Sequence, residues 1–156
     1  MDDMFNLKLD QIFEQIGDHA KIVLATSNSN NRVSARNMCF IILNKKLYFQ
    51  TDNTFRKYYD LKENNQVALC INNIQIEGIC EELGHPLDNV DFINKFKEYF
   101  ISSFKAYSSL ESERLFVINP TFIQKWSYID DKPVIEQFNI NQLTYVKKYY
   151  SKDKIN

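Results

Sequence analysis

The sequence predicts a mainly β fold with helices, built as a closed antiparallel barrel of about six to eight strands. Short runs rich in β-branched and aromatic residues recur along most of the chain, separated by turn residues. These runs follow one another as hairpins do, and closure into a barrel removes exposed strand edges. The 156 residues include 12 Phe and 9 Tyr but only 3 Gly and 3 Pro, which favours one ordered domain.

The first expected elements are a helix and a hairpin. An amphipathic helix should run from Met4 to Ile16 and end at Gly17, because apolar residues recur there at helical spacing. The run KIVLAT at Lys21–Thr26 is typical of a strand, and Asn28–Asn31 has turn chemistry. A second strand at Arg32–Leu43 completes the hairpin.

The middle of the chain continues in the same way. After a turn at residues 44–46, a strand at Leu47–Thr51 precedes a short helix at Phe55–Glu63. The strands Gln66–Ile71 and Ile74–Leu83 flank Asn72-Asn73, a dipeptide that tolerates the positive φ angles of a tight hairpin turn. We expect these two strands to pair.

A longer helix near residues 88–107 is indicated by an aromatic stripe, which should form core or an interface. Further strands are expected at Arg114–Ile118 and Phe122–Ile129, separated by Asn119-Pro120, and at Val134–Ile140. The single domain should cover residues 1–146, and the polar, basic residues 147–156 read as a fraying tail.

Charge and composition exclude several classes of partner. The net charge of -1 and the pI near 6.1 give no general attraction to nucleic acid or to an anionic membrane. No apolar run approaches the length of a membrane span, and the N-terminus does not resemble a signal peptide, so a cytoplasmic location is expected.

The cysteines and histidines suggest no catalytic or metal site. Cys39, Cys70 and Cys80 match no zinc or redox spacing and are expected to be buried, inert thiols. His19 and His85 are far apart and next to turn residues, which favours surface positions. No catalytic residue is assigned from the sequence.

The start of the helix at Phe55–Glu63 carries a local conflict. Arg56 and Lys57 fall in its first turn, where the helix dipole disfavours cations by a few tenths to about 1 kcal/mol each. Arg36 and Thr51, on the two preceding strands, should lie near the same point. A phosphate held by free backbone N–H groups, a hydroxyl and basic side chains removes the conflict. The sequence therefore predicts a phosphate site.

Each of these residues also has an ordinary structural interpretation. Taken alone, Arg36 fits an exposed strand residue in a salt bridge, and Arg56 and Lys57 fit a solvated helix face. Thr51 fits a hydroxyl that precedes a helix, a role compatible with a phosphate contact.

Four short motifs occur in a fixed order between Lys21 and about Ile140. They are Arg36 in SARNM, Gln50-Thr51 with Arg56-Lys57 five and six residues beyond Thr51, IQIEG ending at Gly78, and PTFIQKW with Trp126 six residues after Pro120. Together they resemble the pyridoxamine 5'-phosphate oxidase-like, FMN-binding split-barrel family.

The resemblance implies FMN as cofactor, bound at the interface of a homodimer. It places Arg36, Thr51, Arg56 and Lys57 on the FMN phosphate. It places Gln50 and the backbone of Asn37, Met38 and Cys39 against the ring system. Either Asn73 or Gln75 replaces the glutamine that the family carries on a later strand, and Trp126 either approaches the ring from the partner subunit or is ordinary core.

Departures from the family pattern argue against the reaction of its namesake. Enzymes that oxidise the vitamin B6 phosphate have a lysine where this chain has Ile41. Their substrate-binding arginine and histidine correspond to Lys132 and Val134, and a further FMN-binding arginine corresponds to Glu136. The chain instead resembles the shorter, stress-protein-like or nitroimidazole-reductase-like members.

The expected function is an FMN-dependent oxidoreductase that receives a hydride from NADH, NADPH or another donor and passes electrons to an unidentified small molecule. A flavin-binding carrier or redox sensor without turnover, and a member that binds haem or a deazaflavin, stay as alternatives.

Overall fold

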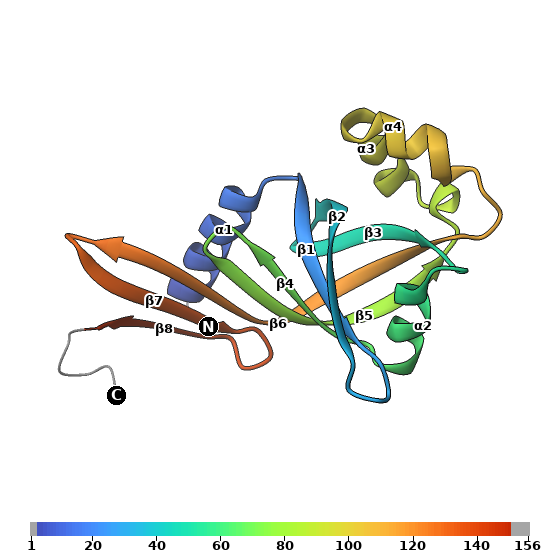
Figure 1. The fold of residues 1–156 in the computed structure, drawn as a ribbon. Helices are drawn as coiled ribbons and strands as arrows, with labels where there is room; N and C mark the ends of the chain where they lie inside the picture. Colours follow the sequence, from blue (N-terminus) through green and yellow to red (C-terminus); the bar gives the residue numbers. More distant parts are fainter. Residues whose placement is uncertain (1–2, 151–156) are drawn as a thin grey trace.

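The computed structural model describes residues 3–150 of the chain. Its strands form one antiparallel sheet in the order β3-β2-β1-β4-β5-β6-β7-β8, and β3 also pairs with β6. This second pairing closes β1 to β6 into a barrel, which confirms the predicted fold class (Figure 1). The strands are β1 (His19–Ser27), β2 (Val33–Leu43), β3 (Lys46–Asp52), β4 (Gln66–Ile71), β5 (Ile74–Gly84), β6 (Glu113–Ile129), β7 (Lys132–Asn139) and β8 (Thr144–Tyr149).

Asparagine-rich turns set the register of the hairpins. Asn44 and Lys45 have φ angles of 51° and 62°, and the turn that they form pairs Leu43 with Lys46. Asn72 has a φ of 50° in the turn between β4 and β5, and the two strands pair as predicted. Asparagine adopts this left-handed conformation at low cost, so the turn positions read from the sequence are confirmed.

β6 is continuous, so the prediction of two strands separated by Asn119-Pro120 is wrong. The register with β5 shifts at this point, where Glu77 pairs with Phe122 and Gly78 pairs with Pro120. The missing N–H of proline is tolerated at such a bulge, and the strand bends without ending.

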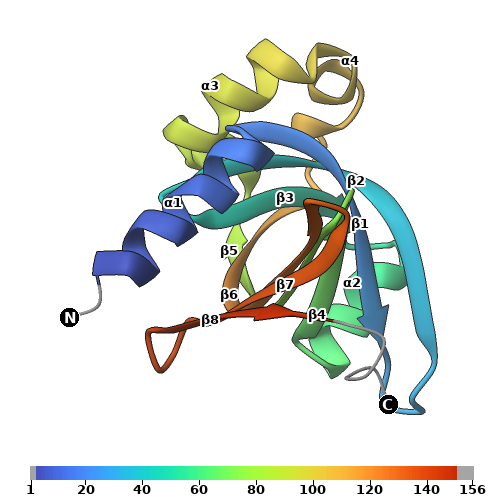
Figure 2. The ribbon, with the colours of Figure 1, turned by 90° about the vertical axis from the view of Figure 1, so that its left-hand side faces the viewer.

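The barrel interior is the main core, and α1 (Asp3–Ile16) lies against it. Four side chains of α1 are buried there, Phe5, Leu9, Ile12 and Ile16. Gly17, with a φ of 87°, ends the helix as the sequence predicts. Figures 1 and 2 show α1 and α2 (Arg56–Glu63) on different sides of the barrel.

A helical insertion, residues 86–108, covers the outer face of β2, β3 and β6. It consists of a 3-10 turn (Pro86–Asp88), α3 (Val90–Tyr99), α4 (Ile101–Ser103) and a π-helical turn (Phe104–Ser108). The helix predicted near residues 88–107 is thus present but interrupted, because Phe100 leaves helical geometry at φ −131° and ψ 53°. Its aromatic stripe forms a second core with Ile41 and Leu115.

The end of the described chain differs from the prediction. β8 continues to Tyr149, so the first residues of the predicted tail belong to a strand, and residues 151–156 lie outside the described part. Lys147 lies opposite Glu136 in the pairing of β7 with β8, and Tyr145 packs on Phe138. These contacts attach the basic segment to the sheet. β7 and β8 extend the sheet beyond the barrel (Figure 1).

The cysteines also differ in part from the prediction. Cys80 is buried, as expected, but Cys39 is half-buried and Cys70 is exposed. Cys70 lies on the outward-facing side of β4, so its apolar neighbours in the sequence do not imply burial. No helix within residues 3–150 is long and apolar enough to cross a membrane.

Candidate functional site

Three basic side chains gather where α2 begins. The N-cap residue of α2, Phe55, makes no side-chain hydrogen bond, and Arg56 and Lys57 follow it. Arg36 on β2 donates to the carbonyl of Leu24 at 3.1 Å. Burial is the main cause that lowers the pKa of Arg36 and of Lys57, and repulsion between nearby cations adds to both shifts. The structure thus brings the predicted cations together at a helix N-terminus.

Thr51 is buried beside this cluster with its hydroxyl unsatisfied. The residue is 3% exposed, and its Oγ1 is the one buried side-chain polar atom within residues 3–150 that has no hydrogen-bond partner. An unpaired buried hydroxyl costs about 1–3 kcal/mol. A ligand oxygen at this point would remove that cost.

A cavity of about 250 Å³ opens next to Thr51 and Lys57. Most of the residues predicted to face the flavin ring line one side of it, and the helical insertion lines the other. The lining residues are Asn37, Met38 and Cys39 on β2, Gln50 and Thr51 on β3, Phe55 and Lys57 at α2, Phe96, Ser103 and Tyr107 of the insertion, and Glu113 on β6. Thr51 and Lys57 therefore share one cavity with the predicted ring contacts, whereas Arg36 and Arg56 do not line it.

A buried polar network lies at the wall of this cavity. Ser108 donates to Gln50 Oε1 at 2.9 Å, and Gln50 Nε2 donates to Glu113 Oε2 at 2.6 Å. Burial raises the pKa of the Glu113 carboxyl to about 7, and the hydrogen bond from Gln50 acts in the opposite direction. The network orients Gln50 and places a titratable carboxyl in the site.

Three predicted ring contacts lie elsewhere in the chain. Asn73 donates to the carbonyl of Trp126, and Gln75 donates to Glu77 at 3.2 Å, both toward the end of β5 that is remote from Glu113. Trp126 is 41% exposed, so it is not core. None of the three lines the cavity within a single chain.

Two of the positions that differ from vitamin B6 phosphate oxidases, Ile41 and Val134, are closed to ligands, whereas Lys132 is exposed. Ile41 and Val134 are 0% exposed, each packed within the protein. Glu136 accepts a hydrogen bond from the Tyr145 hydroxyl at 2.6 Å. These side chains serve the fold rather than a substrate.

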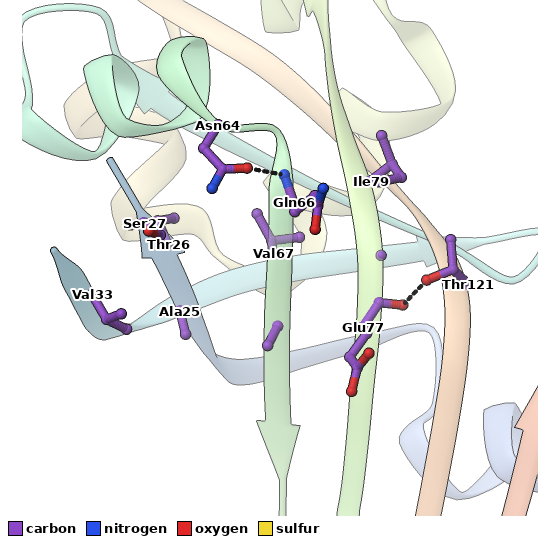
Figure 3. Close-up of a pocket in the computed structure, with 12 residues that line it drawn as sticks. Ala25, Thr26, Ser27, Val33, Asn64, Gln66, Val67, Glu77, Ile79 and Thr121 are labelled. Atoms are coloured by element: carbon purple, nitrogen blue, oxygen red, sulfur yellow. Dashed lines mark hydrogen bonds between the residues drawn. The ribbon is translucent and has the colours of Figure 1, made fainter. Parts of the chain in front are cut away.

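A second cavity, of about 330 Å³, opens over β1, β4 and β5. Figure 3 shows Thr121 donating to the carbonyl of Glu77, and Asn64 accepting from the backbone of Gln66, along its edge. Glu77 is the one charged residue that lines it, and no basic side chain does. It therefore offers no counterpart to the cation cluster, and the first cavity is the candidate site.

No pattern in the sequence indicates the residues on the far wall of the site. Ser103 and Tyr107 reach the cavity, and Glu113 on β6 becomes part of its wall, because the helical insertion folds back over the outer face of the barrel. This contact between the insertion and the cavity depends on tertiary packing. Neither the spacing nor the types of the residues in the sequence predict it.

Comparisons with known proteins identify the fold. No family model and no curated protein sequence matches the chain. The chain is similar to a solved structure from Clostridium acetobutylicum, a protein related to general stress protein 26, with 14% identity over 92% of this chain and 100% of that one, at a TM-score of 0.63. A pyridoxamine 5'-phosphate oxidase-related, FMN-binding protein from Nostoc punctiforme matches with 13% identity over 93% of each chain, at 0.57.

A third similar structure is HutZ, the haem storage protein from Vibrio cholerae, with 17% identity over 71% of this chain and 87% of that one, at a TM-score of 0.58. The resemblance read from the four sequence motifs is thus confirmed at the level of the fold. The chain has the split-barrel fold of the pyridoxamine 5'-phosphate oxidase-like, FMN-binding proteins.

Proposed function

We propose that this protein is an FMN-dependent oxidoreductase acting on a small molecule. The observation that carries the proposal is the unsatisfied Thr51 hydroxyl beside Arg36, Arg56 and Lys57 at the start of α2. A buried hydroxyl donor, a free helix N-terminus and clustered cations are each unfavourable alone and are all satisfied by one phosphate group. The FMN-binding protein with the same fold supports FMN as the phosphate carrier.

The residues of the site fit FMN as follows. Arg36, Thr51, Arg56 and Lys57 would hold the phosphate. Gln50, fixed by Ser108 and Glu113, would present its amide to the polar edge of the ring system. When bound, FMN supplies a carrier of two electrons and a proton. The protein's part is to bind and orient the cofactor and to exclude water.

The site is completed by a second subunit in this proposal. Trp126 is the only tryptophan in the chain, and it is exposed on β6 away from the cavity. In a homodimer, Trp126 of the partner subunit would approach the ring. Light scattering at low micromolar concentration should give a dimer, and FMN should quench tryptophan emission. A monomer that binds FMN without quenching would contradict the shared site.

Haem, which the name of HutZ suggests, fits less well. Both ring nitrogens of His85 are engaged, Nε2 with the carbonyl of Leu110 at 2.8 Å and Nδ1 with the backbone N–H of Leu87 at 3.1 Å. His19 contacts Asp18 and stacks on Tyr99. Neither histidine lines the cavity, so neither is placed to ligate an iron there. The visible spectrum of the purified protein separates flavin from haem.

Binding of FMN and riboflavin tests the phosphate site. FMN should bind far more tightly than riboflavin, because the proposed contacts are mostly to phosphate. Arg56→Ala should weaken FMN binding by about 10- to 100-fold, the loss of one charge-assisted hydrogen bond, and should leave riboflavin binding unchanged. Arg32→Ala is the matched control, since Arg32 is exposed at the β1–β2 turn. Equal affinity for FMN and riboflavin would refute the assignment.

Reduction kinetics test the enzymatic part. Stopped-flow mixing of the FMN-loaded protein with NADH or NADPH should bleach the flavin absorbance at a rate that saturates with donor concentration. A protein that binds FMN but is reduced by neither donor would be a carrier or a sensor.

A further inference from the structure

Glu113 presents an unused hydrogen-bond acceptor to the cavity. The residue is 3% exposed and lines the cavity, and its Oε2 accepts from Gln50. Its Oε1 accepts no hydrogen bond within the described part of the chain and, unlike Thr51 Oγ1, is not fully buried, so it is open to a ligand. A buried carboxyl with one free oxygen is a site for a ligand that donates a hydrogen bond.

Aromatic side chains form the walls on either side of this carboxyl. Phe96 and Tyr107 line the cavity from the helical insertion, and Phe55 lines it from the start of α2. A flat ring could therefore lie between these side chains and a cofactor ring placed against β2.

The charges around Glu113 favour a cation once phosphate is bound. Asp52 pairs with Glu113 across β3 and β6, and hydrogen bonds from Ser112 and Thr54 lower the pKa of its carboxyl. Lys57 and His85 also face Glu113. A bound phosphate would take up the charge of Lys57, which leaves the two carboxyls without a cation of their own.

We propose that this cavity, in the FMN-dependent enzyme proposed above, binds a planar substrate that donates a hydrogen bond to Glu113, and that a planar cation binds best. β2 would face the cofactor, whereas Glu113 and the helical insertion would face the substrate. Glu113 is thus a specificity-determining residue.

Three probes of nearly the same size and shape test this inference: benzamidine, a cation; benzamide, a neutral donor; and benzoate, an anion. Affinities are measured by calorimetry, with and without saturating FMN. Benzamidine should bind about 10- to 100-fold more tightly than benzoate at pH 8, with benzamide between them. FMN should increase the preference for benzamidine.

Variants assign the preference to the carboxyl. Glu113→Gln retains an oxygen that can accept from Gln50, and it should lower benzamidine affinity about tenfold while sparing benzamide. Glu111→Gln removes the same charge from an exposed position and should change neither affinity. In the wild type, benzamidine affinity should rise from pH 6 to pH 8 as Glu113 ionises, and Glu113→Gln should remove that rise.

The outcomes separate the two proposals. No preference among the probes, or a preference that survives in Glu113→Gln, would overturn the inference even if FMN binds. Competition between FMN and benzamidine would also overturn it, because the two ligands would then occupy the same position in the cavity. A Glu113-dependent preference in a protein that does not bind FMN would sustain the cation site and refute the proposed cofactor.

Discussion

Replacing Thr51 by valine should make the protein without FMN more stable and should weaken FMN binding. Valine has nearly the same volume as threonine, so the substitution removes an unpaired hydroxyl from a site that is 3% exposed without leaving a cavity. Leaving such a group unsatisfied costs about 1–3 kcal/mol, so Thr51→Val should raise the free energy of unfolding by about 1 kcal/mol or more. In a domain of this size, that gain raises Tm by about 2–4 °C.

The effect on binding has the opposite sign. If Thr51 donates to a phosphate oxygen, its loss should cost about 1.5–3 kcal/mol, which is about 10- to 100-fold in Kd. Urea unfolding without FMN measures the stability, and quenching of FMN fluorescence measures the affinity. The two measurements are independent, so each sign can be checked separately.

Thr26→Val is the matched control for stability. Thr26 is 2% exposed, but its hydroxyl donates to Asp60 at 3.2 Å and accepts from Arg36 at 2.9 Å. The same substitution there should destabilise the protein, because two partners lose a hydrogen bond. If Thr51→Val also destabilises the protein and leaves FMN affinity unchanged, Thr51 is an ordinary structural residue and the reasoning fails.

Three further predictions concern the fold, the titration of the site and the substrate. Gly78→Ala should destabilise the protein by about 1–3 kcal/mol in urea unfolding, because a Cβ there would lie 2.7 Å from the carbonyl oxygen of Asn119; unchanged stability would show that the bulge can relax. Between about pH 5 and pH 7, the wild type should lose on the order of 2–3 kcal/mol of stability relative to Glu113→Gln, since the carboxyl ionises from about 4.5 in the unfolded chain but only near 7 when folded; parallel pH profiles would contradict this. Oxidation of pyridoxamine phosphate by the FMN-loaded protein, followed as peroxide release, should be at least about a thousandfold less efficient than in a dedicated oxidase, because the buried Ile41 and Val134 offer its phosphate no polar contact. Efficiency near that of such an oxidase would mean that other residues rebuild the substrate site.

The hairpins were predictable because their signals are local. Turn residues such as Asn44 and Asn72 adopt left-handed backbone conformations that few other residues tolerate, and they fix where one strand ends and the next begins. Because the hairpins follow one another along the chain, closure of the sheet into a barrel is the simplest way to remove its exposed edge strands. The same local reading made the prediction at Pro120 wrong, because proline alone indicates the end of a strand. Its pairing with Gly78 at a bulge depends on a strand far away in the sequence.

The cation cluster at the start of α2 was predictable, and the opposite wall of the cavity was not. Arg56 and Lys57 stand out against the helix that carries them, so their conflict is visible in the sequence. In the sequence, Glu113 follows a polar segment and resembles a surface glutamate. In the structure it is buried, and it lines the cavity together with residues of the insertion. The interruption at Phe100, which brings the end of the insertion to the cavity, likewise has no sequence marker such as proline or glycine.

Within the described part of the chain, three cations without an ion pair and one unpaired hydroxyl lie at one edge of the barrel. By comparison, the partly buried Glu82 accepts from Tyr58 and forms ion pairs with Lys62 and Arg114. In contrast, Arg36, Arg56 and Lys57 form no ion pair within residues 3–150, and Thr51 lacks any partner. The charges around Glu82 are neutralised within the protein, whereas the cations at the start of α2 are not. The protein is therefore less stable at the start of α2 when no ligand is bound. Binding of an anion at this edge would neutralise the cations and give the Thr51 hydroxyl an acceptor. We therefore base the functional proposal on this site and not on the fold.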